Sequence, residues 1–86
     1  MSSLAIQRIF TLQREAKNGQ QIAQVLHSEG FSIVETHVAF VQTGYVVSIE
    51  KLPDSLVLHI SEQPMEQVEI MTPKVDPNSL PSVYWN

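Results

Sequence analysis

Few side chains in this sequence have the types and spacing that chemistry requires. His37 and His59, together with Glu35 and Glu50, could supply two imidazoles and a carboxylate to zinc or another transition metal. The two histidines are isolated, however, and form neither an H-x-H nor an H-E-x-x-H pattern. We therefore expect no metal site, and we interpret both residues as solvated or partly packed strand histidines.

Nucleophilic catalysis has no better support. It needs a serine or cysteine beside a base and an orienting acid. The chain has no cysteine, and none of its serines lies in a G-x-S-x-G turn. Its three glycines are too few for a glycine-rich phosphate loop, and Glu66 and Glu69 read more simply as a solvated face than as an acid–base pair. The sequence predicts a protein that is not an enzyme and holds no cofactor.

Length and composition predict one small domain with a limited core. The chain has 86 residues, of which 43% are hydrophobic and only 16% are charged, whereas about 25% is typical. A low charge content leaves more neutral and apolar surface in water. This favours a protein that associates with itself or with a protein partner.

Charge and targeting signals exclude several classes of protein. The net charge is −4, and the five lysines and arginines are scattered, whereas duplex binding depends on several basic residues that neutralise phosphates. This acidic balance argues against nucleic acid as a partner. No apolar run reaches the length of a membrane span, and the N-terminus lacks a signal-peptide pattern. We expect a cytoplasmic protein that does not enter the membrane.

The strongest local pattern predicts a helix over 19–29. Asn18 can cap its start, and Gln21 stands three residues later, which is the spacing of a capping box. Gly30 follows where a helix ends in the left-handed conformation, and Phe31 is placed to fold back on the last turn.

Two other segments fit either a helix or a strand. Residues 3–12 alternate as a strand, although a helical stripe is also present, and we predict a strand. The sequence from Ile33 to Ile49 could be a helix with one apolar face, composed of Val34, Val38, Val41, Tyr45 and Ile49. Nine of its seventeen residues are Val, Ile or Thr, which favour sheets, and Gly44 would cost a helix interior about 1 kcal/mol. We therefore predict a hairpin with strands near 32–41 and 45–51.

The helical alternative carries a function of its own. Residues 22–38, IAQVLHSEGFSIVETHV, resemble helix–turn–helix segments, in which a helix with a small residue (here Ala23) and a leucine leads through glycine to a second helix. The resemblance implies a DNA-binding regulator that uses residues 19–47. Its reading helix, near 34–47, would have no lysine or arginine. It would offer DNA only Thr36, His37, Gln42 and Thr43.

The C-terminal part combines a clear strand with a proline-rich tail. Residues 55–61 alternate as a strand, and 66–71 fits either a strand or a helix. We divide the chain into a domain over 1–72 and an extended tail over 73–86. The tail ends in Val83, Tyr84 and Trp85. We predict that it folds back over its own sheet and adds apolar area to the small core. The open alternative is that these three residues bind a partner, because aromatic side chains often anchor interfaces.

Together these patterns predict an α+β domain with one principal helix on a small antiparallel sheet. Exposed strand edges in so small a sheet favour pairing, so we expect a homodimer or a complex with a protein partner. The predicted function is a non-catalytic interaction or regulatory accessory module. The alternative is the helix–turn–helix regulator.

Overall fold

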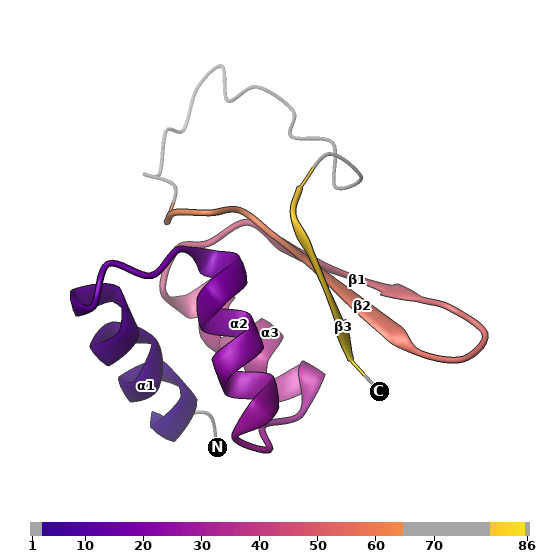
Figure 1. The fold of residues 1–86 in the computed structure, drawn as a ribbon, viewed down its shortest axis with the longest axis horizontal. Coiled ribbons are helices and arrows are strands. Elements are labelled where there is room, and N and C mark those ends of the chain that lie inside the picture. The colour runs from indigo at the N-terminus through magenta and orange to yellow at the C-terminus, as the bar shows by residue number, and fades with distance from the viewer. Residues whose placement is uncertain (1–2, 65–79, 86) are drawn as a thin grey trace.

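The computed structural model describes residues 3–64 and 80–85. Three helices come first: α1 (Ser3–Arg14), α2 (Gly19–Ser28) and α3 (Ile33–Gln42). A three-stranded antiparallel sheet follows, made of β1 (Val47–Lys51), β2 (Leu56–Ile60) and β3 (Ser82–Trp85) in the order β1-β2-β3. The helices cluster on one face of the sheet, and the β1–β2 hairpin projects beyond them (Figure 1). The α+β class is confirmed, and no helix in these two ranges is long and apolar enough to cross a membrane.

Reciprocal side-chain caps define where α2 and α3 begin. The side chain of Asn18 accepts from the Gln21 backbone N–H at 2.8 Å, and the Gln21 side chain accepts from the Asn18 N–H. This confirms the capping box predicted for the first of these helices. Ser32 and Glu35 repeat the arrangement at the start of α3. The second box satisfies the first free amides of a helix in a segment for which the sequence predicts a strand.

All three helices end with a residue in the left-handed conformation. Gly30 and Gly44 both have φ of 95°, and Ala16 has φ of 65°. The following residue then donates its N–H back to the last turn: Phe31 to the Leu26 carbonyl, for example, at 3.1 Å. This pattern is the Schellman motif, in which glycine is favoured because it has no Cβ to clash. Ala16 occupies the position at a steric cost.

We therefore predict that Ala16→Gly stabilises the fold by about 1 kcal/mol, because glycine relieves the left-handed strain. Gly30→Ala is the matched control and should destabilise by a similar amount. A Cβ at Gly30 meets no atom within 4 Å, so its cost is that of the backbone alone. Urea unfolding followed by circular dichroism measures both. Equal stability of Ala16→Gly and the wild type would contradict the strain at Ala16.

The prediction of one principal helix is wrong, because the two segments predicted as strands over 3–12 and 32–41 instead form α1 and, after the Ser32 cap, α3. In α1 the residues at helical spacing, Ala5, Ile9 and Leu12, are buried at 0%, 0% and 2% exposure, so the helical stripe prevails over the alternation. For α3 the penalty assigned to Gly44 does not arise. The helix ends at Gln42, and Gly44 lies beyond the cap, where glycine is favoured.

The other strands agree better with the sequence. Strands β1 and β2 confirm those predicted near 45–51 and 55–61, and they pair with Val47 opposite Ile60. Strand β3 lies inside the range assigned to the tail and pairs antiparallel with β2, with Val83 opposite Leu58. The possible strand at 66–71 and the tail residues 73–79 lie outside the described residues.

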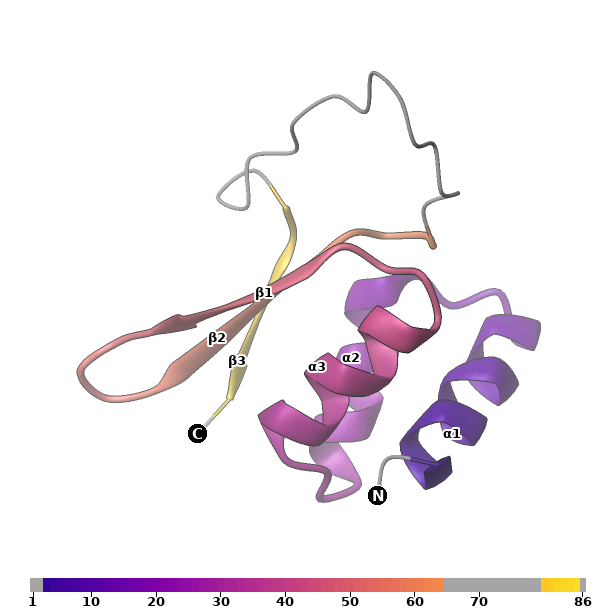
Figure 2. The same ribbon diagram turned by 180° about the vertical axis from the view of Figure 1, so that it is seen from behind.

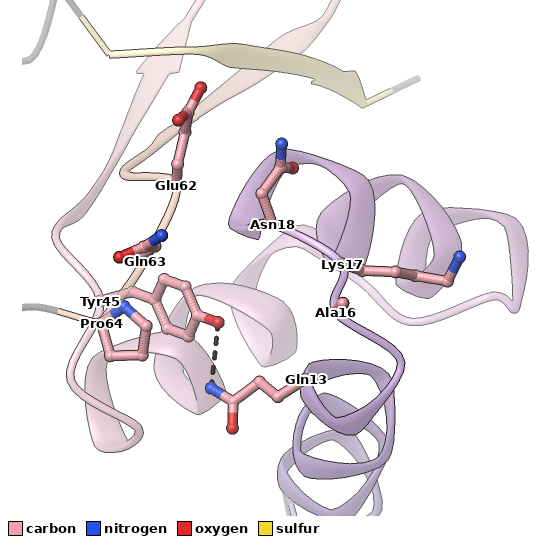
Figure 3. Close-up of a pocket in the computed structure, with 8 residues that line it drawn as sticks. All are labelled: Gln13, Ala16, Lys17, Asn18, Tyr45, Glu62, Gln63 and Pro64. Atoms are coloured by element: carbon pink, nitrogen blue, oxygen red, sulfur yellow. Dashed lines mark hydrogen bonds between the residues drawn. The ribbon is translucent and has the colours of Figure 1, made fainter.

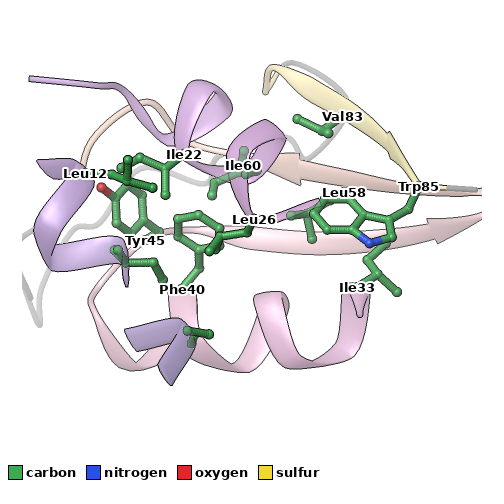
Figure 4. Close-up of a cluster of buried hydrophobic side chains, with 14 residues drawn as sticks. Leu12, Ile22, Leu26, Ile33, Phe40, Tyr45, Leu58, Ile60, Val83 and Trp85 are labelled. Carbon is green, nitrogen blue, oxygen red and sulfur yellow. The ribbon is translucent and has the colours of Figure 1, made fainter. Parts of the chain in front are cut away.

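One apolar core joins helices and sheet (Figure 4). Phe40 is fully buried, and its ring meets that of Tyr45 edge-on, with centroids 4.9 Å apart. At the far end of the core the Trp85 ring lies 4.5 Å from the His27 ring, and its Nε1 donates to the Phe31 carbonyl at 3.2 Å. The last strand is thereby attached to the turn between α2 and α3. The labelled members of the core are Leu12, Ile22, Leu26, Ile33, Phe40, Tyr45, Leu58, Ile60, Val83 and Trp85.

Two neighbours in β3 test this attachment. Trp85 is 6% exposed and Tyr84 is 60% exposed. Trp85→Ala should lower the free energy of unfolding by about 3–5 kcal/mol, the usual cost of emptying a large buried site. Tyr84→Ala should change it by about 0.5 kcal/mol or less, as expected of a surface position. Urea unfolding monitored by circular dichroism distinguishes them, and equal effects would contradict the docking of Trp85 on its own core.

Candidate interaction surface

The outer face of α3 carries three of the large apolar side chains that are exposed in the described chain. Val34, Val38 and Val41 follow at spacings of four and three residues, so they lie on one side of the helix. Their exposed fractions are 62%, 37% and 52%. We call these three residues the valine stripe. In Figure 2, α3 lies in front of α2.

The stripe is exposed because the opposite side of α3 packs into the core. Ile33, Thr36, Ala39 and Phe40 are buried. Thr36 is the polar member, and its hydroxyl donates to the Ser32 carbonyl at 2.8 Å, which satisfies it within the helix. With both ends capped and one face buried, a helix rich in β-branched residues holds despite its modest intrinsic propensity.

The charges around the stripe are few and mainly acidic. Helix α3 contains Glu35 and His37 but no lysine or arginine. Arg8, on α1, forms a two-pronged ion pair with Glu29, with contacts of 2.6 and 3.0 Å. The hydrogen bonds from Arg8 lower the pKa of the Glu29 carboxyl. That ion pair joins α1 to the end of α2. Helix α3 itself contributes no basic side chain to its outer face.

The titration of Glu35 makes the stability of the fold depend on pH. The Ser32 backbone N–H and then its hydroxyl hydrogen bond to the carboxylate form and lower the pKa of Glu35 below its usual 4.5. A lowered pKa in the folded state gives stability that is present above the unfolded pKa. That stability is lost as pH falls through the folded pKa, because the unfolded chain binds more protons there.

Glu35→Gln should therefore flatten the loss of stability below pH 4.5. The glutamine amide oxygen still accepts from the Ser32 N–H, as Gln21 does at the start of α2, so the cap persists without its titration. In this variant Glu29, paired with Arg8, still titrates, so some loss of stability at acidic pH remains. Urea unfolding at a series of acidic pH values measures the slope, and an unchanged slope would contradict the role of Glu35.

The structure separates the residues predicted to bind a partner. Val83 and Trp85 face the helices and are 5% and 6% exposed, whereas Tyr84 faces away and is 60% exposed. Tyr84 is thus the member of this trio with substantial free surface. Partner binding by Val83, Tyr84 and Trp85 stays a prediction.

A shallow depression lies on another side of the molecule, where the turn between α1 and α2 meets the end of β2 (Figure 3). Two of its lining residues are bonded to each other, since Gln13 Nε2 donates to the Tyr45 hydroxyl at 3.0 Å. Lys17 and Glu62 are its charged residues, pointing in different directions. They do not converge on a common point, so the depression shows no constellation for catalysis. Its lining is completed by Ala16, Asn18, Gln63 and Pro64.

Two of the three histidines have structural partners. His27 lies against Trp85, and His59 Nε2 lies 2.9 Å from a Glu50 carboxylate oxygen across β1 and β2. His37 is half-buried on α3, on the side next to the valine stripe. Across residues 3–64 and 80–85, no three histidine, aspartate or glutamate side chains come together as a metal site would require.

Comparison of the chain with protein families, with curated proteins and with solved structures gave no match. The candidate surface therefore rests on the chain's own chemistry. The sequence contains the signal of this surface, since Val34, Val38 and Val41 share one face of the helical alternative. The choice of a hairpin for this segment hid the stripe.

Proposed function

We propose that this protein is a small non-catalytic interaction module, regulatory or accessory in role, that binds protein through the outer face of α3. The observation that carries the proposal is the exposed valine stripe on a helix with no lysine or arginine. Covering apolar surface yields about 25 cal/mol per Å², and a row of apolar anchors on one helix face is a recurrent mode of protein recognition. A cytoplasmic location belongs to the same proposal, because small secreted domains usually depend on disulfides and this chain has no cysteine.

One observation favours a second candidate, DNA binding. Helices α2 and α3, joined at Gly30, have the order of a helix–turn–helix, and the β1–β2 hairpin follows as it does in winged forms of that arrangement. In such proteins the second helix enters the major groove. Here that helix would present valines and Glu35, where phosphates and base edges call for cations and hydrogen-bond donors. The scaffold fits DNA, but the chemistry of the face fits protein better.

A matched pair of variants tests the proposal. Val34 and Leu4 are each the second residue of their helix, with exposed fractions of 62% and 68%. A glutamate near a helix N-terminus is favoured by the helix dipole, so Val34→Glu and Leu4→Glu should both fold. We expect Val34→Glu to lose at least tenfold in affinity for protein partners captured from the source cell, because it puts a charge on the stripe. Leu4→Glu should bind as the wild type does.

Anisotropy with a labelled random-sequence duplex tests the alternative. We expect the protein not to bind the duplex. Binding at low salt that weakens as the salt concentration rises would be the signature of phosphate contacts. Salt-sensitive binding that Val34→Glu abolishes would favour the DNA-binding regulator instead. Equal partner capture by Val34→Glu and Leu4→Glu would refute the assignment of the stripe as the binding face.

A further inference from the structure

Strand β1 is an edge of the sheet with a row of free backbone groups. Ser61 donates its N–H to the Val46 carbonyl and Leu52 donates to the Ser55 carbonyl, both at 2.9 Å. Hydrogen-bonded pairs alternate along an antiparallel ladder, so Ser48 and Glu50 also point their backbone groups at β2. The N–H and C=O groups of Val47, Ile49 and Lys51 point the other way, and they have no backbone partner within the described residues.

The opposite edge of the sheet is less open. Ile60 donates to the Pro81 carbonyl at 2.9 Å, so by the same alternation Ser82 and Tyr84 point outward from β3. The Ser82 carbonyl already accepts from Gln20 Nε2 at 3.1 Å. A side chain from α2 thus occupies one of the few outward groups of this short strand, and β1 is the better edge for pairing.

The free edge of β1 and helix α3 lie on the same side of the molecule. In Figure 2, α3 and β1 both face the viewer, while α2 and β3 lie behind them. Ile49 is 38% exposed, and its side chain is on the face of the sheet that carries the helices, as is that of Val47. A single partner approaching from this side would cover both features.

We propose that this partner is a second copy of the chain, which pairs its own β1 antiparallel with the free edge of β1 about a two-fold axis at Ile49. The two sheets then become one continuous sheet, and both α3 helices lie on the same face beside the join. This inference rests on the proposed function, because it names the partner of the same surface.

Register and charge favour the second copy as the occupant. With Ile49 opposite its own equivalent, Val47 lies opposite Lys51 of the other copy, so every outward residue of β1 meets another outward residue. Glu50 then faces Ser48, so no like charges stand opposite each other. Centring the axis on Lys51 would instead oppose two lysines. The register that pairs the whole strand is also the one without repulsion.

Lys51 adds a second complementarity. In this register it lies beside the other copy's Val47, a few residues beyond the end of that copy's α3. Helix α3 has no basic residue in its own last turn, and a cation is favoured near the carbonyl end of a helix. Each copy would supply that charge to the other.

The test uses the full chain and two variants. Ile49→Pro removes one outward N–H without removing a bond to β2, because proline is tolerated on the free side of an edge strand. Val34→Glu puts a charge on the exposed face of α3, which each copy brings to the same face of the joined sheet, and Leu4→Glu is its matched control. Sedimentation equilibrium should give twice 9.7 kDa for the wild type and Leu4→Glu. It should give 9.7 kDa for Ile49→Pro, with an unchanged circular dichroism spectrum, and a shift towards that mass for Val34→Glu.

Amide hydrogen exchange supplies a readout within the wild-type protein. Val47, Ile49 and Lys51 should exchange slowly at dimer concentrations and quickly on dilution, whereas Ser48 and Glu50 should be slow throughout. A wild-type monomer, a dimer that survives Ile49→Pro, or protection of Val47 that is independent of concentration would each overturn the dimer. Partner capture lost in Val34→Glu but kept in Ile49→Pro would overturn this inference and leave the proposed function standing.

Discussion

The shared apolar core is the constraint on which the rest of this structure depends. Helices of 12, 10 and 10 residues are too short to persist alone in water. They hold because each gives one stripe to a core around Phe40 and because caps satisfy the ends of α2 and α3. The sheet closes that core, with Leu58 and Ile60 at its centre and Trp85 at its far end. Removing the sheet or any one of the helices would expose apolar side chains of the remaining elements.

The same constraint explains why α3 has an exposed apolar face. Its buried side already packs on α1 and the sheet, so the core makes no further use of Val34, Val38 or Val41. A monomer would do better with polar residues there, as the outer side of α2 shows with Gln21 and Gln24. This contrast between two neighbouring helices is the reason for proposing that the stripe contacts another molecule.

The arrangement of α2 and α3 and the side chains that α3 exposes suggest different functions. Capping boxes and left-handed helix ends recur from α2 to α3 at a constant spacing, with Asn18 and Ser32 at the starts and Gly30 and Gly44 after the ends. These local caps set where α2 and α3 begin and end, and burial in the core holds the two helices in place. Such a scaffold carries no function of its own, since function resides in the side chains it presents. Here those side chains are apolar and acidic.

The sequence by itself determined the features that rest on local chemistry. The capping box at Asn18, the end of α2 at Gly30, and the alternation of β1 and β2 all depend on neighbours a few residues away. Tertiary structure decided α1, α3 and β3. Residues 3–12 and 33–42 suit either a strand or a helix, and only the burial of Ile9 and Phe40 selects the helical face. Trp85 became a core residue through a bond to Phe31, 54 positions away, which no local pattern encodes. The position of the valine stripe follows from the burial of Phe40, because burying that side of α3 leaves the opposite side, with Val34, Val38 and Val41, exposed to solvent.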